Sequence, residues 1–319
     1  MARIPPDLSK ETTERVLEVK GDEEGTRLDV FLRNRVPWRS REHLKERIRD
    51  GRVTVNDRPA KASQSVRYGD VVSIHLVRHG DPFDPSEIPL PVLYEDDLVV
   101  VIDKPAGFVV HPVGRHQHDT IINALHHRYR NTEEPEKDVV PKLAHRLDQY
   151  TSGVLLVAKR DDVRSDLGRQ FAQREVKKEY LAIVMGAPDP AEGEVEAPIG
   201  KNREMKNGLP MGVRDDGEPS LTLYETVEVL GDHSLVRCRP LSGRTHQIRV
   251  HLAWLGTPLV ADQMYGDGEP LVVAGETLLS NYPLHSAALE FTHPGTGKRL
   301  RVEAPLPGDM ERVVEALRG

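Results

Sequence analysis

The residues best suited to chemistry lie in one short stretch near the middle of the chain, HRLDQYTSG at residues 145–153. It brings a histidine, an arginine and an aspartate close together and ends in small, turn-forming residues. The apolar run VLLVA at residues 154–158 follows directly and predicts a buried strand. A charged group at the entrance to a buried strand needs a partner or a function. For an isolated Arg-x-Asp, a capped turn or a local ion pair is the commoner explanation.

Three further segments accompany this stretch and weaken the simpler explanation. They are VIDKPAG followed by HP within residues 101–112, KKEYLA at 177–182, and GRTHQIRVH at 243–251. The four motifs, in this order, resemble those of the RluA/RluD-type pseudouridine synthases over about residues 88–305. The resemblance implies an enzyme that isomerises uridine to pseudouridine in structured RNA.

Pseudouridine formation detaches uracil from ribose through a ring nitrogen, turns it, and rejoins it through carbon 5. A protein must supply a carboxylate, a plane that positions the base, and shielding from water. The resemblance makes Asp148 the essential group, which attacks the anomeric carbon or removes the neighbouring ribose proton. Tyr180 would stack on uracil and help to remove the carbon 5 proton, and Arg249 would pair with Asp148 and keep it ionised. No metal and no organic cofactor is expected.

The motifs also imply groups that bind the substrate. Arg146 would fill the gap left in the RNA when the uridine flips out, and the apolar side of Leu284 would line the base pocket. The other expected substrate contacts are the motif residues His145, Thr151, Arg244 and His246. One departure concerns RNA contact: Glu218 stands where many family members have a lysine, which would weaken phosphate contact at that loop.

The N-terminal part has a different charge from the rest of the chain. Residues 27–74 hold twelve Lys and Arg against six Asp and Glu, although the whole chain has a net charge of −7. Residues 15–78 resemble an S-four-type RNA-binding module, in which a basic helix lies against phosphates. The expected helix 41–50 turns Leu44 and Ile48 inward. The candidate RNA contacts are Arg41, Lys45, Arg47 and Arg49 on its outer side, with Arg52 beyond its end.

The order of predicted elements favours an α+β protein. Apolar or alternating runs predict strands within residues 98–102, 180–185 and 221–239, and helical spacing predicts helices at 162–173 and 245–255. The resemblance implies a mixed, mainly antiparallel central sheet flanked by helices. We expect a small module at 15–78, a linker at 79–91, a catalytic domain at 92–319, and a strand-poor loop at 200–220.

Composition sets the cellular setting that we expect. The single cysteine excludes an internal disulfide and suits a reducing cytoplasm, and no apolar run is long enough to span a bilayer. We therefore expect a cytoplasmic monomer whose partner is structured RNA, foremost large-subunit ribosomal RNA. Two alternatives remain at this point: a synthase of the same chemistry that acts on tRNA, and a non-catalytic RNA-binding or ribosome-assembly protein.

Overall fold

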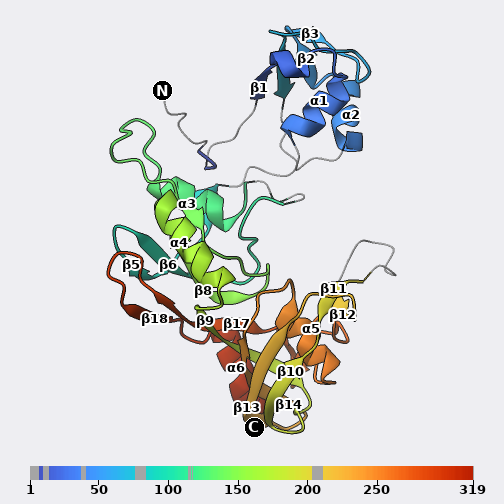
Figure 1. The fold of residues 1–319 in the computed structure, drawn as a ribbon. Helices are drawn as coiled ribbons and strands as arrows, with labels where there is room; N and C mark the ends of the chain where they lie inside the picture. The colour runs from blue at the N-terminus through green and yellow to red at the C-terminus, as the bar shows by residue number, and fades with distance from the viewer. Residues whose placement is uncertain are drawn as a thin grey trace. The chain divides into compact units, whose positions relative to one another are not determined.

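The structure is a computed structural model that describes residues 7–9, 14–36, 41–75, 84–113, 116, 118–202 and 211–318. The chain forms two compact units (Figure 1). The smaller unit is residues 10–82, and the larger unit combines residues 1–9 with residues 83–319.

The smaller unit packs two helices against a small antiparallel sheet. The helices are α1 (Leu28–Arg35) and α2 (Arg41–Arg49), preceded by a short 3-10 turn, Gly21–Glu23. The sheet has the order β1 (Glu14–Glu18), β4 (Val71–His75), β2 (Val53–Val55), β3 (Arg58–Pro59). Leu44 and Ile48 on α2 are buried, as their spacing predicted, and pack with Phe31 of α1 in one apolar core.

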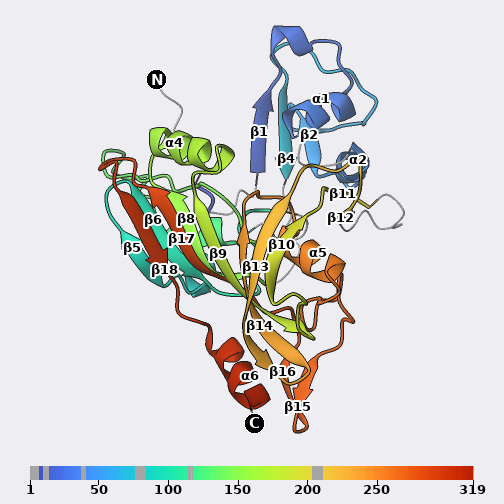
Figure 2. The same ribbon diagram turned by 60° about the horizontal axis from the view of Figure 1, so that its bottom comes forward.

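The larger unit is built on a ten-stranded sheet, which confirms the expected α+β class (Figure 2). Its pairing is antiparallel throughout except between β8 and β17. The main path is β10 (Glu192–Glu196), β13 (Leu221–Leu230), β14 (His233–Pro240), β9 (Lys177–Met185), β17 (Leu284–Thr292), β8 (Ser152–Ala158), β6 (Val99–Lys104), β5 (Val92–Glu95), with β18 (Arg299–Glu303) beside β17 and β7 (Lys142–Leu143) beside β8.

Helices cover both faces of this sheet, which explains why β8 is apolar along its length. Leu155 and Val157 of β8 pack in one core with residues of α3 (Ile121–Tyr129) and α5 (Gln247–Trp254). Val154 and Leu156 pack in a second core with α4 (Asp161–Ala172). Alternate residues of a strand point to opposite faces, so a strand covered on both sides must be apolar at every position.

The remaining elements complete the larger unit. They are the 3-10 turn Pro85–Glu87, helix α6 (Gly308–Arg318), the hairpin of β15 (Leu271–Val273) and β16 (Glu276–Leu279), and the pair β11 (Ile199–Lys201) with β12 (Met211–Val213). In the part of the chain that the structure describes, no helix combines the length and apolar character needed to cross a membrane.

Two segments differ from the elements expected from sequence. Residues 200–220, expected to be a strand-poor loop, contain the paired strand ends of β11 and β12, while residues 203–210 lie outside the described residues. Residues 84–91, expected to lie in a linker, contribute the buried side chain of Ile88 to the core of the larger unit. An apolar side chain in a Pro-rich stretch is buried here because α3 lies beside it.

Candidate active site

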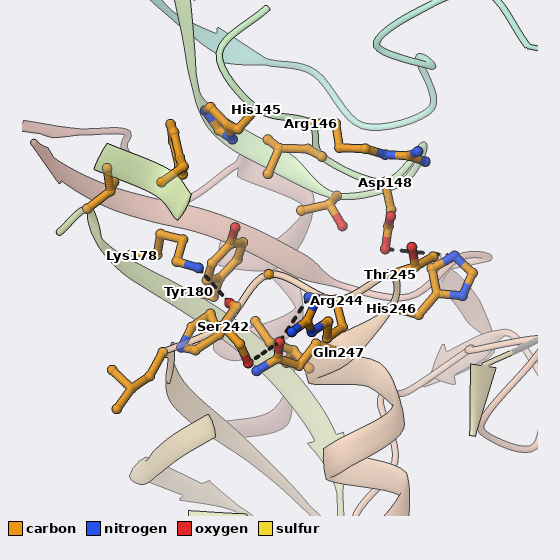
Figure 3. A pocket seen from close by; sticks show the side chains of 18 of the residues that line it. His145, Arg146, Asp148, Lys178, Tyr180, Ser242, Arg244, Thr245, His246 and Gln247 are labelled. Carbon is orange, nitrogen blue, oxygen red and sulfur yellow. Dashed lines mark hydrogen bonds and ion pairs between the residues drawn. The ribbon is translucent and has the colours of Figure 1, made fainter. Parts of the chain in front are cut away.

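A cavity of about 480 Å³ opens in the larger unit where the loop before β8, the start of β9 and the loop between β14 and α5 meet. Nine residues that the sequence analysis named as catalytic or substrate-binding line this cavity (Figure 3). They are His145, Arg146, Asp148, Thr151, Tyr180, Arg244, His246, Arg249 and Leu284. Residues from four separate stretches of the chain therefore line one cavity.

Asp148 lies on the short loop that leads into β8, and its side chain is 20% exposed. The loop is fixed on both sides. The backbone N–H of Thr151 donates to the carbonyl oxygen of Asp148 at 3.2 Å, and that of Gly107 donates to the carbonyl oxygen of Gln149 at 2.9 Å. A second bond, from the Gln149 side chain to the Gly107 carbonyl at 3.0 Å, ties the same two segments together. Asp148 is thus held in place by backbone contacts that leave its carboxylate accessible.

Lys104, to which the sequence alone assigned no role, supports the loop that carries Asp148. Its side chain is fully buried, and its Nζ donates to three carbonyl oxygens, those of Pro105 at 2.8 Å, Phe108 at 3.0 Å and Gln149 at 3.0 Å. Burial lowers the pKa of Lys104 to about 7, against the opposite effect of the carboxylates of Asp148 and Asp103. In the sequence, the signal for this buried cation was a lysine at the end of an apolar strand.

Gly153 allows the strand that follows Asp148 to approach β17 closely. Its φ is +100°, and a Cβ at this position would lie 2.2 Å from the carbonyl oxygen of Ser286. Ser152 and Gly153 pair with His285 and Ser286 in the parallel register of β8 and β17. A side chain at residue 153 would push these strands apart and move the loop that carries Asp148.

Arg249 does not make the expected direct pair with Asp148, and this expectation is corrected. Its Nε and Nη2 both donate to the carboxylate of Asp262, each at 2.7 Å, and both side chains are buried. The guanidinium also lies over the ring of Tyr282, 3.9 Å from its centroid, and 4.9 Å from that of Tyr265. The physical reason is geometric: Asp262 meets the planar fork of the arginine with both oxygens, which fixes the guanidinium in that orientation.

The charge of Arg249 nevertheless acts on the site. Burial lowers its pKa, but the hydrogen bonds to Asp262 and the nearby Tyr282 and Asp148 more than offset this, so the pKa is raised. Asp262 also accepts the backbone N–H groups of Met264 at 3.0 Å and Tyr265 at 3.2 Å. Asp262 therefore organises the turn that carries Tyr265. Its sequence signal was an acidic residue closing the apolar run Leu259 to Ala261.

His246 lies beside Asp148, with 4.0 Å between its Nε2 and Oδ2 of the carboxylate. Its Nδ1 lies 2.8 Å from the hydroxyl of Tyr265, which also accepts the N–H of Met211 at 3.0 Å. The backbone of His246 is left-handed, with φ +57°, which is uncommon outside glycine. Burial lowers the pKa of His246, against the opposite effect of the Asp148 carboxylate, and so favours the neutral ring.

Tyr180 is buried and His145 is partly buried at the wall of the cavity. Burial raises the pKa of Tyr180 to about 12, so its hydroxyl keeps its proton at neutral pH. Burial lowers the pKa of His145 to about 3, and its Nε2 accepts the backbone N–H of Leu156 at 2.9 Å while its ring stacks on Phe171. His145 thus lines the cavity and also holds β8 in place.

The other expected substrate groups differ in exposure. Arg146 is exposed at the mouth of the cavity, whereas Thr151 and Leu284 are buried in its wall. Arg244 is half-buried, and its Nη2 lies 3.4 Å from the carboxylate of Glu218. The acidic residue noted as a departure in the sequence therefore faces a cation of the cavity.

The smaller unit presents fewer free cations than expected. Arg47 was expected to point outward but is buried, with 5% exposure, because the short helix packs most of its turns into the module. Arg41 is exposed but donates to the buried carboxylate of Asp29 at 2.8 Å, and Lys45 pairs with Glu42 at 2.9 Å. Arg49 is exposed and Arg52, just beyond the helix, is partly exposed.

Comparison with known proteins agrees with these motifs and with the two units. A family model described as RNA pseudouridylate synthase matches residues 98–254, and a model of the S4 domain matches residues 26–72. The chain is 40% identical over 304 residues to ribosomal large subunit pseudouridine synthase D of Xanthomonas campestris, covering 92% of this chain and 89% of that protein. It is 36% identical over 316 residues to ribosomal large subunit pseudouridine synthase C of Escherichia coli K12, covering 95% and 97%.

A solved structure shows the same likeness in three dimensions. Human RNA pseudouridylate synthase domain containing 4 superposes with a TM-score of 0.57 at 26% identity, over 72% of this chain and 93% of that one. The two bacterial relatives, which are 40% and 36% identical over nearly the whole chain, share more with it than the fold. The chain belongs to the RNA pseudouridylate synthase family and carries an S4 domain before its catalytic unit.

Proposed function

We propose that this protein converts specific uridines of large-subunit ribosomal RNA to pseudouridine, with Asp148 as the group that acts on the ribose. The relatives named above bear the names of ribosomal large subunit pseudouridine synthases and match nearly the whole chain. One observation carries the assignment of the residue: the accessible carboxylate of Asp148 lies in the same cavity as the ring of Tyr180.

The reaction breaks the bond between C1′ and N1 of the uridine and forms a bond between C1′ and C5. N1 gains a proton and C5 loses one, so atoms balance without any other reactant. Whether the carboxylate adds to C1′ or removes the adjacent ribose proton, it must approach the sugar from the wall of a cavity that admits a nucleotide. Asp148 meets this requirement because backbone bonds fix its loop and leave the carboxylate partly exposed.

Tyr180 and Leu284 are the groups we propose to hold the uracil. The phenol ring and the buried Leu284 line one cavity and offer the flat and apolar surfaces that a base needs. A pKa of about 12 keeps the Tyr180 hydroxyl protonated, which favours stacking and hydrogen-bond donation over action as a phenolate base. Arg249, fixed by Asp262, would contribute positive charge to the site without touching Asp148 directly.

Exposed cations of both units would make the remaining contacts with RNA. Arg146, exposed at the mouth of the cavity, would fill the space left by the flipped uridine. Arg49 and Arg52 of the S4 domain would contact phosphates, with Arg41 and Lys45 beside them. We propose that the protein acts as a monomer, and ribosomal RNA as the substrate supports a cytoplasmic location.

The test is to replace Asp148 by Asn and map pseudouridine across all RNA of cells that carry the parent or the variant gene. We expect the ribosomal RNA sites made by the parent to vanish while RNA binding persists. The exposed Asp267→Asn serves as the control and should leave every site in place. Sites found only in tRNA would replace the proposed substrate, and equal modification by Asp148→Asn and the parent would refute the role of this carboxylate.

A further inference from the structure

The cavity has a positively charged end that lies away from Asp148. Lys178 and Asp148 stand on opposite sides of the cavity in Figure 3, and Arg174 and Arg244 also line it. Among the described residues, neither Lys178 nor Arg174 has a carboxylate within ion-pair distance. Two cations without a counter-charge therefore share one hollow with Arg244.

Lys178 is held so that its charge faces the cavity. Its Nζ donates to the carbonyl oxygen of Ser242 at 2.6 Å, which leaves further N–H groups free for another acceptor. Burial lowers the pKa of Lys178 to about 8, and the charge of Arg174 acts in the same direction. A partly desolvated cation beside a second cation is unfavourable, and a bound anion would relieve both effects.

Arg244 is a second group in this cavity that is suited to binding an anion. Its Nε is buried and has no hydrogen-bond partner among the described residues. Its Nη2 approaches Glu218, whose side chain is 71% exposed. A buried N–H without a partner is rare in folded proteins and calls for an acceptor.

We propose that Lys178, Arg174 and Arg244 form a subsite for a backbone phosphate of the RNA next to the target uridine, and that Glu218 competes for Arg244 in the free protein. This inference rests on the proposed function, because an RNA chain whose uridine enters at Asp148 carries a phosphate on each side of that nucleotide. The exposed carboxylate of Glu218 would swing into solvent when the phosphate binds, so Glu218 weakens RNA binding.

The test compares two substitutions that should act in opposite directions. The probe is unmodified large-subunit ribosomal RNA transcribed in vitro, and the Kd is measured by filter binding at several salt concentrations. Lys178→Gln should raise the Kd by about tenfold and lower the salt slope by about one, as expected for one lost phosphate contact. Glu218→Gln should lower the Kd and steepen the slope, because it frees Arg244.

Matched variants separate the subsite from general effects. Lys298→Gln removes an exposed cation between β17 and β18, outside the cavity, and should leave the Kd unchanged. Lys178→Arg keeps the charge and should restore most of the affinity. The single-turnover rate constant at saturating protein should stay close to that of the parent in Lys178→Gln.

Two outcomes would overturn the subsite. One is a Kd for Glu218→Gln that equals or exceeds that of the parent, a result that does not depend on the half-buried Lys178 variant folding. The other is a Lys178→Gln variant whose Kd equals that of the parent and whose single-turnover rate constant alone is lowered. A parent protein that forms no pseudouridine in the transcript would instead contradict the proposed function, and the binding comparison would still judge the subsite.

Discussion

Arg249 illustrates how this site keeps a charge inside the protein. Its guanidinium is matched by both oxygens of Asp262 and contacts the rings of Tyr282 and Tyr265. A buried ion pair gains little over an apolar pair, but removing one partner leaves an uncompensated buried charge. The pair therefore acts as a fixed support for the turn that carries Tyr265, which in turn bonds to His246 in the wall of the cavity.

We predict that Asp262→Asn destabilises the protein by about 3–5 kcal/mol, the usual cost of breaking a buried pair. The measurement is the free energy of unfolding from denaturant titration. Glu228→Gln removes the partner of Arg318 in an ion pair that is largely exposed, and it should change stability little. Equal effects of the two substitutions would show that Arg249 finds another partner, and Asp148 would be the obvious candidate.

At the scale of single residues, the sequence identified the side chains that gather in the cavity but not the groups that bond to them. Asp148, Tyr180 and Arg249 stand in motifs, so their types and order could be read directly. Asp262 lies 13 residues beyond Arg249, and only the turn after α5 brings the two together. Lys104 was part of a motif, but its three carbonyl acceptors come from two separate loops that no spacing rule relates.

At the scale of elements, the contact between β8 and β17 decides where Asp148 lies. We predict that Gly153→Ala lowers the free energy of unfolding by several kcal/mol, because its Cβ would meet the backbone of Ser286 and φ is +100°. Gly168→Ala is the matched control. Gly168 lies within α4 with open space around it, so alanine there should stabilise the helix by about 0.5–1 kcal/mol. Two substitutions of the same size should thus have opposite signs in thermal unfolding.

A loss of stability in Gly153→Ala no larger than that of an average point mutant would mean that β8 and β17 can separate without cost. The rate of pseudouridine formation is a second measurement on the same variant. If the close approach positions Asp148, the rate constant for pseudouridine formation should fall even where the protein is still folded. An active, folded Gly153→Ala would contradict that role.

Periodicity in the sequence predicted most long elements, since β8, β9, α4 and the hairpin of β13 and β14 all carry continuous apolar runs or clear spacing. The short strands β11 and β12 were missed because three residues show no period. Their pairing depends on residues brought together by the rest of the fold. The outward direction assigned to Arg47 failed for a similar reason, because a short helix packed in a small module buries more than one stripe.

At the scale of the whole molecule, the two units differ in charge, and this difference predicts how each contributes to RNA binding. The S4 domain holds an excess of basic residues, twelve Lys and Arg against six Asp and Glu within residues 27–74, while the chain as a whole is acidic. Each phosphate contact contributes about 0.9 to the slope of log K against log salt. Loss of contacts from Arg49 and Arg52, with Arg41 and Lys45 beside them, should therefore lower that slope by about 2–4.

We predict that deleting residues 1–82 weakens binding and its salt dependence more than it harms turnover on a short stem-loop. Such a deletion also removes residues 7–9, where Leu8 bonds to Asn123 and His126 of α3. Deletion of residues 1–13 is the control, because it removes these contacts but leaves β1 and the rest of the S4 domain in place. The difference in salt slope between the two deletions measures the module alone. If that difference is close to zero, RNA affinity resides in the catalytic unit, and the cations of α2 are ordinary solvated charges.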